Sequence, residues 1–191
     1  MTKQERCVWC DENSQIYKDY HDKEWGVPIR DNDRLLFELL ILEGAQAGLS
    51  WITILQRREN YHKTFDNFEI KKIANYDEKK ISELINNKEI IRNKLKINSA
   101  VKNAKIALKI IEEFNSLGKY FWHWTDGNVI QNNFTNHSEI PTKTALSEEI
   151  SKDLKKRGMS FVGPTIIYSF MQAIGMVNDH TTNCFRHKEL K

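Results

Sequence analysis

The chain has 191 residues, a formal net charge of +3 and a pI near 8.6, and 40% of its residues are hydrophobic. These values predict one globular domain and allow a polyanionic partner without requiring one. The polar start of the chain lacks a secretory signal pattern, and charged or polar residues interrupt its longest apolar stretch, 35–55. We therefore expect a cytoplasmic protein with no membrane span. Three cysteines, an odd number, argue against a disulfide framework in the reducing cytoplasm. The thiols and histidines are therefore better examined as metal ligands.

The first third of the chain predicts loops followed by two helices. Residues 1–30 have poor helical periodicity and predict loops and short turns. Asp31 or Asp33 can cap a helix that carries leucines as far as position 42. Ser50 can cap a second helix that runs to about residue 65.

The remaining chain predicts further helices and no sheet. A helix begins at Tyr76-Asp77, and the longest one covers 91–114 and ends at Gly118, since apolar residues recur there every three or four positions. The aromatic run 120–124 predicts a core plug, and 125–141 is polar and turn-like. Thr144 or Ser147 begins a helix that Gly158 stops, and a last helix runs from about Pro164 to near Gly175. No alternating stretch is long enough for a sheet, so the predicted fold class is all-α.

The segment Gly158-Met159-Ser160-Phe161-Val162-Gly163-Pro164-Thr165 lies between two predicted helices. Free backbone N–H groups of such a turn and of the following helix can bind an anion. Three cationic residues, 155–157, directly precede it. The segment is similar to a helix-hairpin-helix DNA-binding turn, which grips a phosphate without reading sequence. An ordinary αα-hairpin is the alternative.

Both ends of the chain carry possible metal ligands. His180 and Cys184 are spaced i, i+4, which places two ligands on one side of a helical turn. Cys7, Cys10 and His21 lie near the N-terminus. Four N or S ligands would form a closed structural zinc site that ties the two ends together. The pattern leaves open whether Cys10 or His21 is the fourth ligand, and unconnected residues remain the alternative.

The segment Leu42–Trp51 places Glu43 among small residues and ends on a tryptophan. A carboxylate is rarely buried without a partner, and an indole face attracts flat and cationic rings. This pair therefore suits a cationic or donor-rich aromatic ligand. Core packing or a partly exposed helix end is the alternative reading. Four more aromatic residues could share such a pocket: Trp9, Tyr17, Tyr20 and Trp25.

These features coincide in one known family. The chain resembles the DNA-3-methyladenine glycosylase I family, bacterial base-excision enzymes of the helix-hairpin-helix superfamily. Its strings YHDKEWGVP and LEGAQAGLSWIT, at positions 20–28 and 42–53, are long enough to be specific. Three further pieces match: Arg6-Cys7 with Trp9, KKRGMSFVG at 155–163, and SFMQAIGMVNDH at 169–180.

The resemblance implies a helix-hairpin-helix glycosylase fold in one domain over residues 1–191. Its helical lobe would cover about 31–145, and a zinc-linked lobe would combine 1–30 with 146–191. The resemblance also implies a structural Zn²⁺ and excludes Cys10 as a ligand. The implied zinc ligands are Cys7, His21, His180 and Cys184.

The implied activity is monofunctional hydrolysis that removes 3-methyladenine from alkylated double-stranded DNA after flipping the base. Glu43 and Tyr20 are the implied catalytic residues, which hydrogen-bond the base. Trp51 would stack on it, with Trp9 and Tyr17 nearby. Free 3-methyladenine would be the product, and a monomer is expected.

The DNA contacts are expected at the hairpin and at one apolar wedge. Leu49 can fill the space that a flipped base leaves. We expect Asp179, beside the implied ligand His180, to have a structural role. The expected hairpin contacts are Ser160, Gly163, Thr165 and Lys156. A non-catalytic zinc protein that binds damaged DNA, or a glycosylase for another lesion such as 3-methylguanine, would share many of these features.

Overall fold

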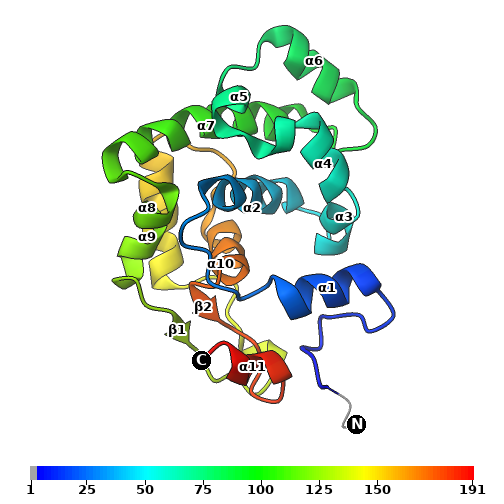
Figure 1. Cartoon of the computed structure of the whole chain (residues 1–191), viewed down its shortest axis with the longest axis vertical. Coiled ribbons are helices and arrows are strands. Elements are labelled where there is room, and N and C mark those ends of the chain that lie inside the picture. The colour runs from blue at the N-terminus through cyan, green and yellow to red at the C-terminus, as the bar shows by residue number, and fades with distance from the viewer. Residues whose placement is uncertain (1–3) are drawn as a thin grey trace.

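The computed structural model describes residues 4–191, and 60% of the chain is helical with 2% in strands (Figure 1). This confirms the predicted all-α class. The α-helices, in chain order, are α1 Gln15–Lys23, α2 Asp33–Gln46, α3 Trp51–Leu55, α4 Arg58–Thr64, α5 Ile70–Ala74, α6 Glu78–Asn86, α7 Lys94–Phe114, α8 Leu117–Trp122, α9 Ala145–Lys156, α10 Pro164–Ala173 and α11 Phe185–Glu189. Among the described residues, none of these helices combines the length and apolar character that a membrane span requires.

Helix α2 lies at the centre of the molecule, between α7 on one side and α10 on the other (Figure 1). Every residue from 36 to 45 is buried, including two glutamates. A helix that is apolar on all faces is typical of the middle of a core. Helices α3, α7, α8 and α10 pack against α2, so they fix the place where its last turn ends.

The described N-terminal segment and α11 lie at the same end of the molecule, far from α6 (Figure 1). A short parallel pair joins β1 (Ile130–Gln131) to β2 (Val177–Asn178) close to α11. Phe185 N–H donates to Glu5 O at 3.0 Å, which ties the C-terminal segment directly to the N-terminal one.

The first thirty residues are more ordered than predicted, because they include α1. Ser14 caps this helix by accepting from Tyr17 N–H. Its buried residues are Tyr20 and His21, so tertiary packing compensates for the weak periodicity of the segment.

The predicted cap of α2 and the predicted extent of the helix that follows it were wrong. Asn32, rather than Asp31 or Asp33, caps α2 by accepting from Leu35 N–H, and Asp33 instead accepts from the N–H groups of Leu117 and Gly118. The helix expected from Ser50 to about 65 is broken into α3 and α4.

The long helix α7 ends at Phe114 on a left-handed Asn115, and Gly118 lies inside α8. A Cβ at Gly118 would come within 1.7 Å of Arg30 O. Glycine is therefore required there by close packing of two backbones and not as a helix stop. Thr144 and Asp77 cap α9 and α6, in agreement with the predicted starts.

Candidate functional site

A cavity of about 370 Å³ lies where the end of α2 meets α1, α3 and α10. It brings together the residues predicted to contact a base, although they are spread over more than forty positions of the sequence. Its lining residues are Trp9, Tyr17, Tyr20, Trp25, Glu43, Gln46, Trp51, His137, Ile140, Ser169 and Gln172.

Glu43 lies in the last turns of α2 and is only 5% exposed. From residue 4 onward, no hydrogen bond or ion pair reaches its carboxyl group, and burial alone raises the pKa of Glu43 to about 8. A buried, unpaired acid is costly to the folded protein unless a ligand later pairs with it. Glu43 is therefore the polar group of the cavity that is best placed to receive a cation or a hydrogen-bond donor.

Aromatic rings form the walls around this acid. The ring centroids of Tyr20 and Trp51 lie 5.4 Å apart, and Trp9 contacts Tyr17 and Trp25 edge-on at 5.8 and 4.9 Å. Burial and the nearby Glu43 carboxylate raise the pKa of the Tyr20 phenol well above its usual value, so Tyr20 stays neutral. Such walls suit a flat ring, and they leave Glu43 only 5% exposed.

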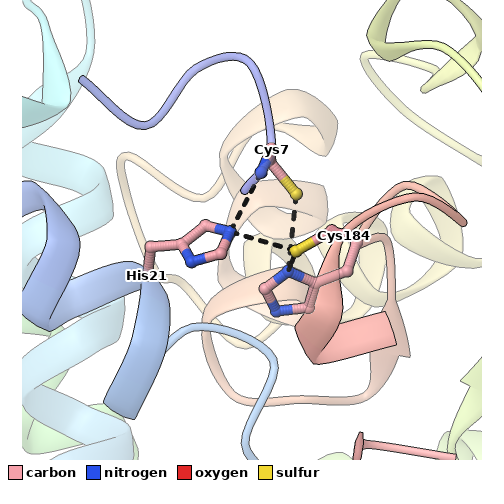
Figure 2. A group of neighbouring side chains, drawn as sticks. Cys7, His21 and Cys184 are labelled. Carbon is pink, nitrogen blue, oxygen red and sulfur yellow. Dashed lines mark hydrogen bonds between the residues drawn. The ribbon is translucent and has the colours of Figure 1, made fainter. Parts of the chain in front are cut away.

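A second cluster lies beside the aromatic wall, and Figure 2 shows Cys7, His21 and Cys184 converging in it. With His180 these residues form a fully buried group whose potential ligand atoms all lie within 4.8 Å of one another. Cys184 Sγ is 3.5 Å from His21 Nε2 and 3.4 Å from His180 Nδ1, and Cys7 Sγ is also 3.4 Å from His180 Nδ1. A tetrahedral zinc site with ordinary bond lengths has S···N edges of roughly 3.5 Å. The cluster therefore fits a metal ion.

The contacts around this cluster also suit metal binding. His21 Nδ1 lies 2.8 Å from Asp22 Oδ1, and His180 Nε2 lies 3.1 Å from Trp25 O, so each ring is held by its outer nitrogen. Hydrogen bonding to Cys7 lowers the pKa of Cys184, which favours one thiolate in the pair. Cys10 is buried but lies outside the group, in agreement with its exclusion as a ligand.

The predicted hairpin connects α9 to α10. Phe161 packs its backbone and Cβ against Gly44, the residue after Glu43, so the turn lies next to the end of α2. Among residues 4–191, the N–H groups of Val162, Gly163 and Thr165 have no hydrogen-bond partner. Gly163 is the N-cap of α10, and the space beside its Cα is open.

The cations before the turn are not equivalent. Arg157 is paired with Asp153 at 2.6 Å and with Glu113 at 2.5 Å, so its charge is neutralised within the protein. Lys156 is exposed and lines a small surface hollow with Trp124. The cation that contacts the turn is Lys102, whose Nζ donates to Ser160 Oγ at 3.3 Å.

The expected wedge residue lies on the turn after α2. Leu49 is 38% exposed, which is unusual among the large apolar residues of this chain. Gln46 Nε2 donates to Leu49 O at 2.6 Å, and Lys96 Nζ donates to Ala45 O and Ala47 O at 2.8 and 2.7 Å. The turn is thus held from both sides while its apolar tip remains in solvent.

Sequence reasoning missed several lining residues. Ser169 and Gln172 are three positions apart on α10, and this spacing could have placed them on one face of the predicted helix. His137 and Ile140 come from the irregular segment before α9, where no periodic signal exists. Gln46 is the last residue of α2, three positions after Glu43. It was missed because the prediction made from this string rested on its small residues and its tryptophan.

Comparisons with known proteins agree with this geometry. The family model described as methyladenine glycosylase matches residues 9–187 of this chain. The DNA-3-methyladenine glycosylase 1 of Escherichia coli strain K12 is 44% identical over 180 residues, which are 94% of this chain and 95% of that protein.

Two solved structures have the same fold. A crystal structure of a 3-methyladenine DNA glycosylase I matches with a TM-score of 0.91 and 45% identity over 95% of this chain and 98% of the other. A variant of such an enzyme in complex with 3-methyladenine matches with a TM-score of 0.90 and 33% identity, covering 94% of this chain and 96% of the other. The match to the family covers nearly the whole chain, and on this ground the chain belongs to the methyladenine glycosylase family.

Proposed function

We propose that this protein is a DNA glycosylase that excises 3-methyladenine from alkylated DNA by hydrolysis. The observation that carries the proposal is the buried, unpaired Glu43 in a cavity walled by aromatic rings. The relatives named for this activity, and the related structure in complex with 3-methyladenine, support the same choice of base.

Base recognition rests on charge and shape. An adenine methylated at N3 carries a positive charge in DNA and must leave the stack to be reached. Glu43 is protonated in the free protein at neutral pH, because its pKa is about 8. A cationic base favours the carboxylate form, so binding is coupled to release of that proton. Trp51 and Tyr20 then stack on or contact a charged ring more strongly than a neutral one.

The chemical step needs little acid catalysis. The C1′–N9 bond breaks with its electron pair moving to the base, and the cationic adenine thereby departs as neutral 3-methyladenine. Water adds to C1′ of the resulting oxocarbenium-like sugar and loses a proton, which leaves an abasic site. No lysine forms a bond to the sugar in this scheme, so the enzyme is monofunctional and leaves the strand uncut.

DNA binding uses the turn between α9 and α10. The free N–H groups of Val162, Gly163 and Thr165 are placed to bind one backbone phosphate, and the helix dipole of α10 favours the same anion. Ser160 lies on the same turn, and Lys156 adds a more distant positive charge. Leu49 enters the duplex where the base has left.

The cluster of Cys7, His21, His180 and Cys184 holds a structural Zn²⁺ in this proposal. Two thiolates and two imidazoles are a donor set that zinc prefers. All four residues are buried and could together supply the four ligands of a closed site, so the ion would supply stability and not chemistry. Its position next to Trp9 and Trp25 fixes part of the aromatic wall, since the ring centroids of Trp9 and His21 lie 5.3 Å apart.

The direct test is base release. Purified protein is incubated with DNA treated with a methylating agent, and the freed bases are separated by chromatography. We expect free 3-methyladenine with little 7-methylguanine, and strands that break only after alkali. No released base from folded, metal-loaded protein would contradict the enzyme and favour a protein that only binds damaged DNA.

A further inference from the structure

A buried carboxylate next to the cavity is linked to one of its lining residues. Asp179 is 1% exposed and lies in the segment after β2. Its Oδ2 accepts from Tyr168 Oη and from Gln172 Nε2, both at 2.7 Å, and its Oδ1 accepts from Asn132 Nδ2 at 2.6 Å. Three short hydrogen bonds from fixed donors hold this acid in one position.

Gln172 is the only one of these three donors that also lines the cavity. Its backbone is held as well, because Gly26 N–H donates to Gln172 O at 3.1 Å. The residue is thus fixed at its main chain by the segment after α1 and at its side chain by Asp179. These two contacts hold Gln172 in one place on the wall of the cavity.

The chemistry of Asp179 decides which way the Gln172 amide points. Asp179 Oδ2 accepts from the amide nitrogen of Gln172 at 2.7 Å, and this hydrogen bond fixes which way the amide is turned. The amide oxygen is left as the polar atom that can face the cavity. Within residues 4–191, no donor is bonded to that oxygen.

We propose that Gln172 is a second hydrogen-bond acceptor for the flipped base, and that Asp179 is the positioning residue that fixes its polarity. This inference rests on the proposed function. The exocyclic amino group of 3-methyladenine has two N–H donors, and Glu43 can accept from only one of them in a planar contact. A neutral acceptor at Gln172 takes the other without adding a second charge to a buried cavity.

The test measures discrimination between two free bases. 3-Methyladenine and 3-methylhypoxanthine, in which a carbonyl oxygen replaces the amino group, are titrated against the full-length protein by quenching of tryptophan fluorescence. The wild-type protein is expected to prefer 3-methyladenine. Gln172→Met keeps the length of the side chain and removes its polar atoms, so the preference should fall roughly tenfold.

Tyr168→Phe is the matched control. It removes a hydrogen bond to the same Asp179 oxygen from a residue that does not line the cavity. The variant should lose thermal stability but keep the wild-type preference within about twofold. An unchanged preference in Gln172→Met, an equal loss of affinity for both bases, or the same change in Tyr168→Phe would overturn the inference. Wild-type protein that binds neither base would instead contradict the proposed function itself.

Discussion

Glu43 is a buried acid that costs the folded protein stability, and the proposed base recognition would account for this cost. It lies on the helix at the centre of the core, yet its carboxyl group has no partner among the described residues. The other buried glutamate of α2, Glu38, pairs with Arg58 at 2.7 Å and Arg34 at 2.9 Å. The contrast between two acids five positions apart shows that this fold can pair a buried carboxylate. In the proposed function, the ligand supplies the partner of Glu43.

Glu43→Gln should stabilise the free protein in a pH-dependent way. Because burial raises the folded-state pKa of Glu43 to about 8, the folded protein binds more protons than the unfolded chain between about pH 4.5 and 8. The wild-type protein therefore loses stability as pH rises through this window, by up to about 1.4 kcal/mol per pH unit. The Tm of Glu43→Gln minus the Tm of wild type should grow from pH 5 to pH 9. A difference that is the same at every pH would contradict this account.

At the scale of elements, the turn between α9 and α10 has one side that packs on the core and another side that is proposed to bind phosphate. Phe161 and Val162 anchor it to the core, and Ser151 Oγ donates to Val162 O at 2.7 Å. The free N–H groups on its other side are left for an anion. A negative charge placed there should stabilise helix α10 and weaken the binding of DNA.

Thr165→Glu tests this separation. Thr165 is exposed in the first turn of α10, where a carboxylate should stabilise the helix by about 0.3–1 kcal/mol. The same charge should weaken binding to duplex DNA about tenfold, as expected for one lost charge-assisted contact. Ser82→Glu on α6 makes the same change of charge far from the turn. Equal DNA affinities of the two variants, measured by fluorescence anisotropy, would refute a phosphate site at the turn.

The elements also show what the sequence could predict. Strong periodicity and good caps placed α6, α7, α9 and α10 to within a few residues. Helix α1 was missed because its buried residues do not form a regular apolar stripe. They are placed to contact the cavity and the Cys and His cluster. The prediction for Gly118 was wrong because the close approach of Arg30, which lies 88 positions earlier, cannot be seen in the local sequence.

For the site, the family resemblance implied Glu43, Tyr20 and the set of two Cys and two His residues, and the structure brings each group together. Their chemical roles remain predictions. The residues that local sequence could not supply are those from irregular segments, such as His137 and Ile140. The proposed division into two lobes also stays a prediction.

At the scale of the whole molecule, the cluster of Cys7, His21, His180 and Cys184 connects segments more than 170 residues apart in the chain. Neither segment has a long helix of its own. The proposed metal ion would join the two segments behind the aromatic wall. Its loss should therefore affect stability and base binding together.

Cys184→Ser should abolish stoichiometric zinc and lower the free energy of unfolding by at least about 3 kcal/mol, the contribution of a ligand at a hundred times its Kd. Cys10→Ser alters a buried thiol outside the cluster and should retain the metal. Elemental analysis and thermal unfolding of the two variants provide the check. A Cys184→Ser protein as stable as Cys10→Ser would exclude a structural metal at this site.

The most direct test of the central claim is the single-turnover rate of 3-methyladenine release by Glu43→Gln from methylated duplex DNA. Glu59→Gln, the same change at an exposed position, is the control. The account predicts roughly a hundredfold loss for Glu43→Gln, the value of a charge-assisted contact that the cationic base no longer makes, and no loss for Glu59→Gln. If folded Glu43→Gln releases the base within about threefold of the wild-type rate, the buried carboxylate is not what recognises the base.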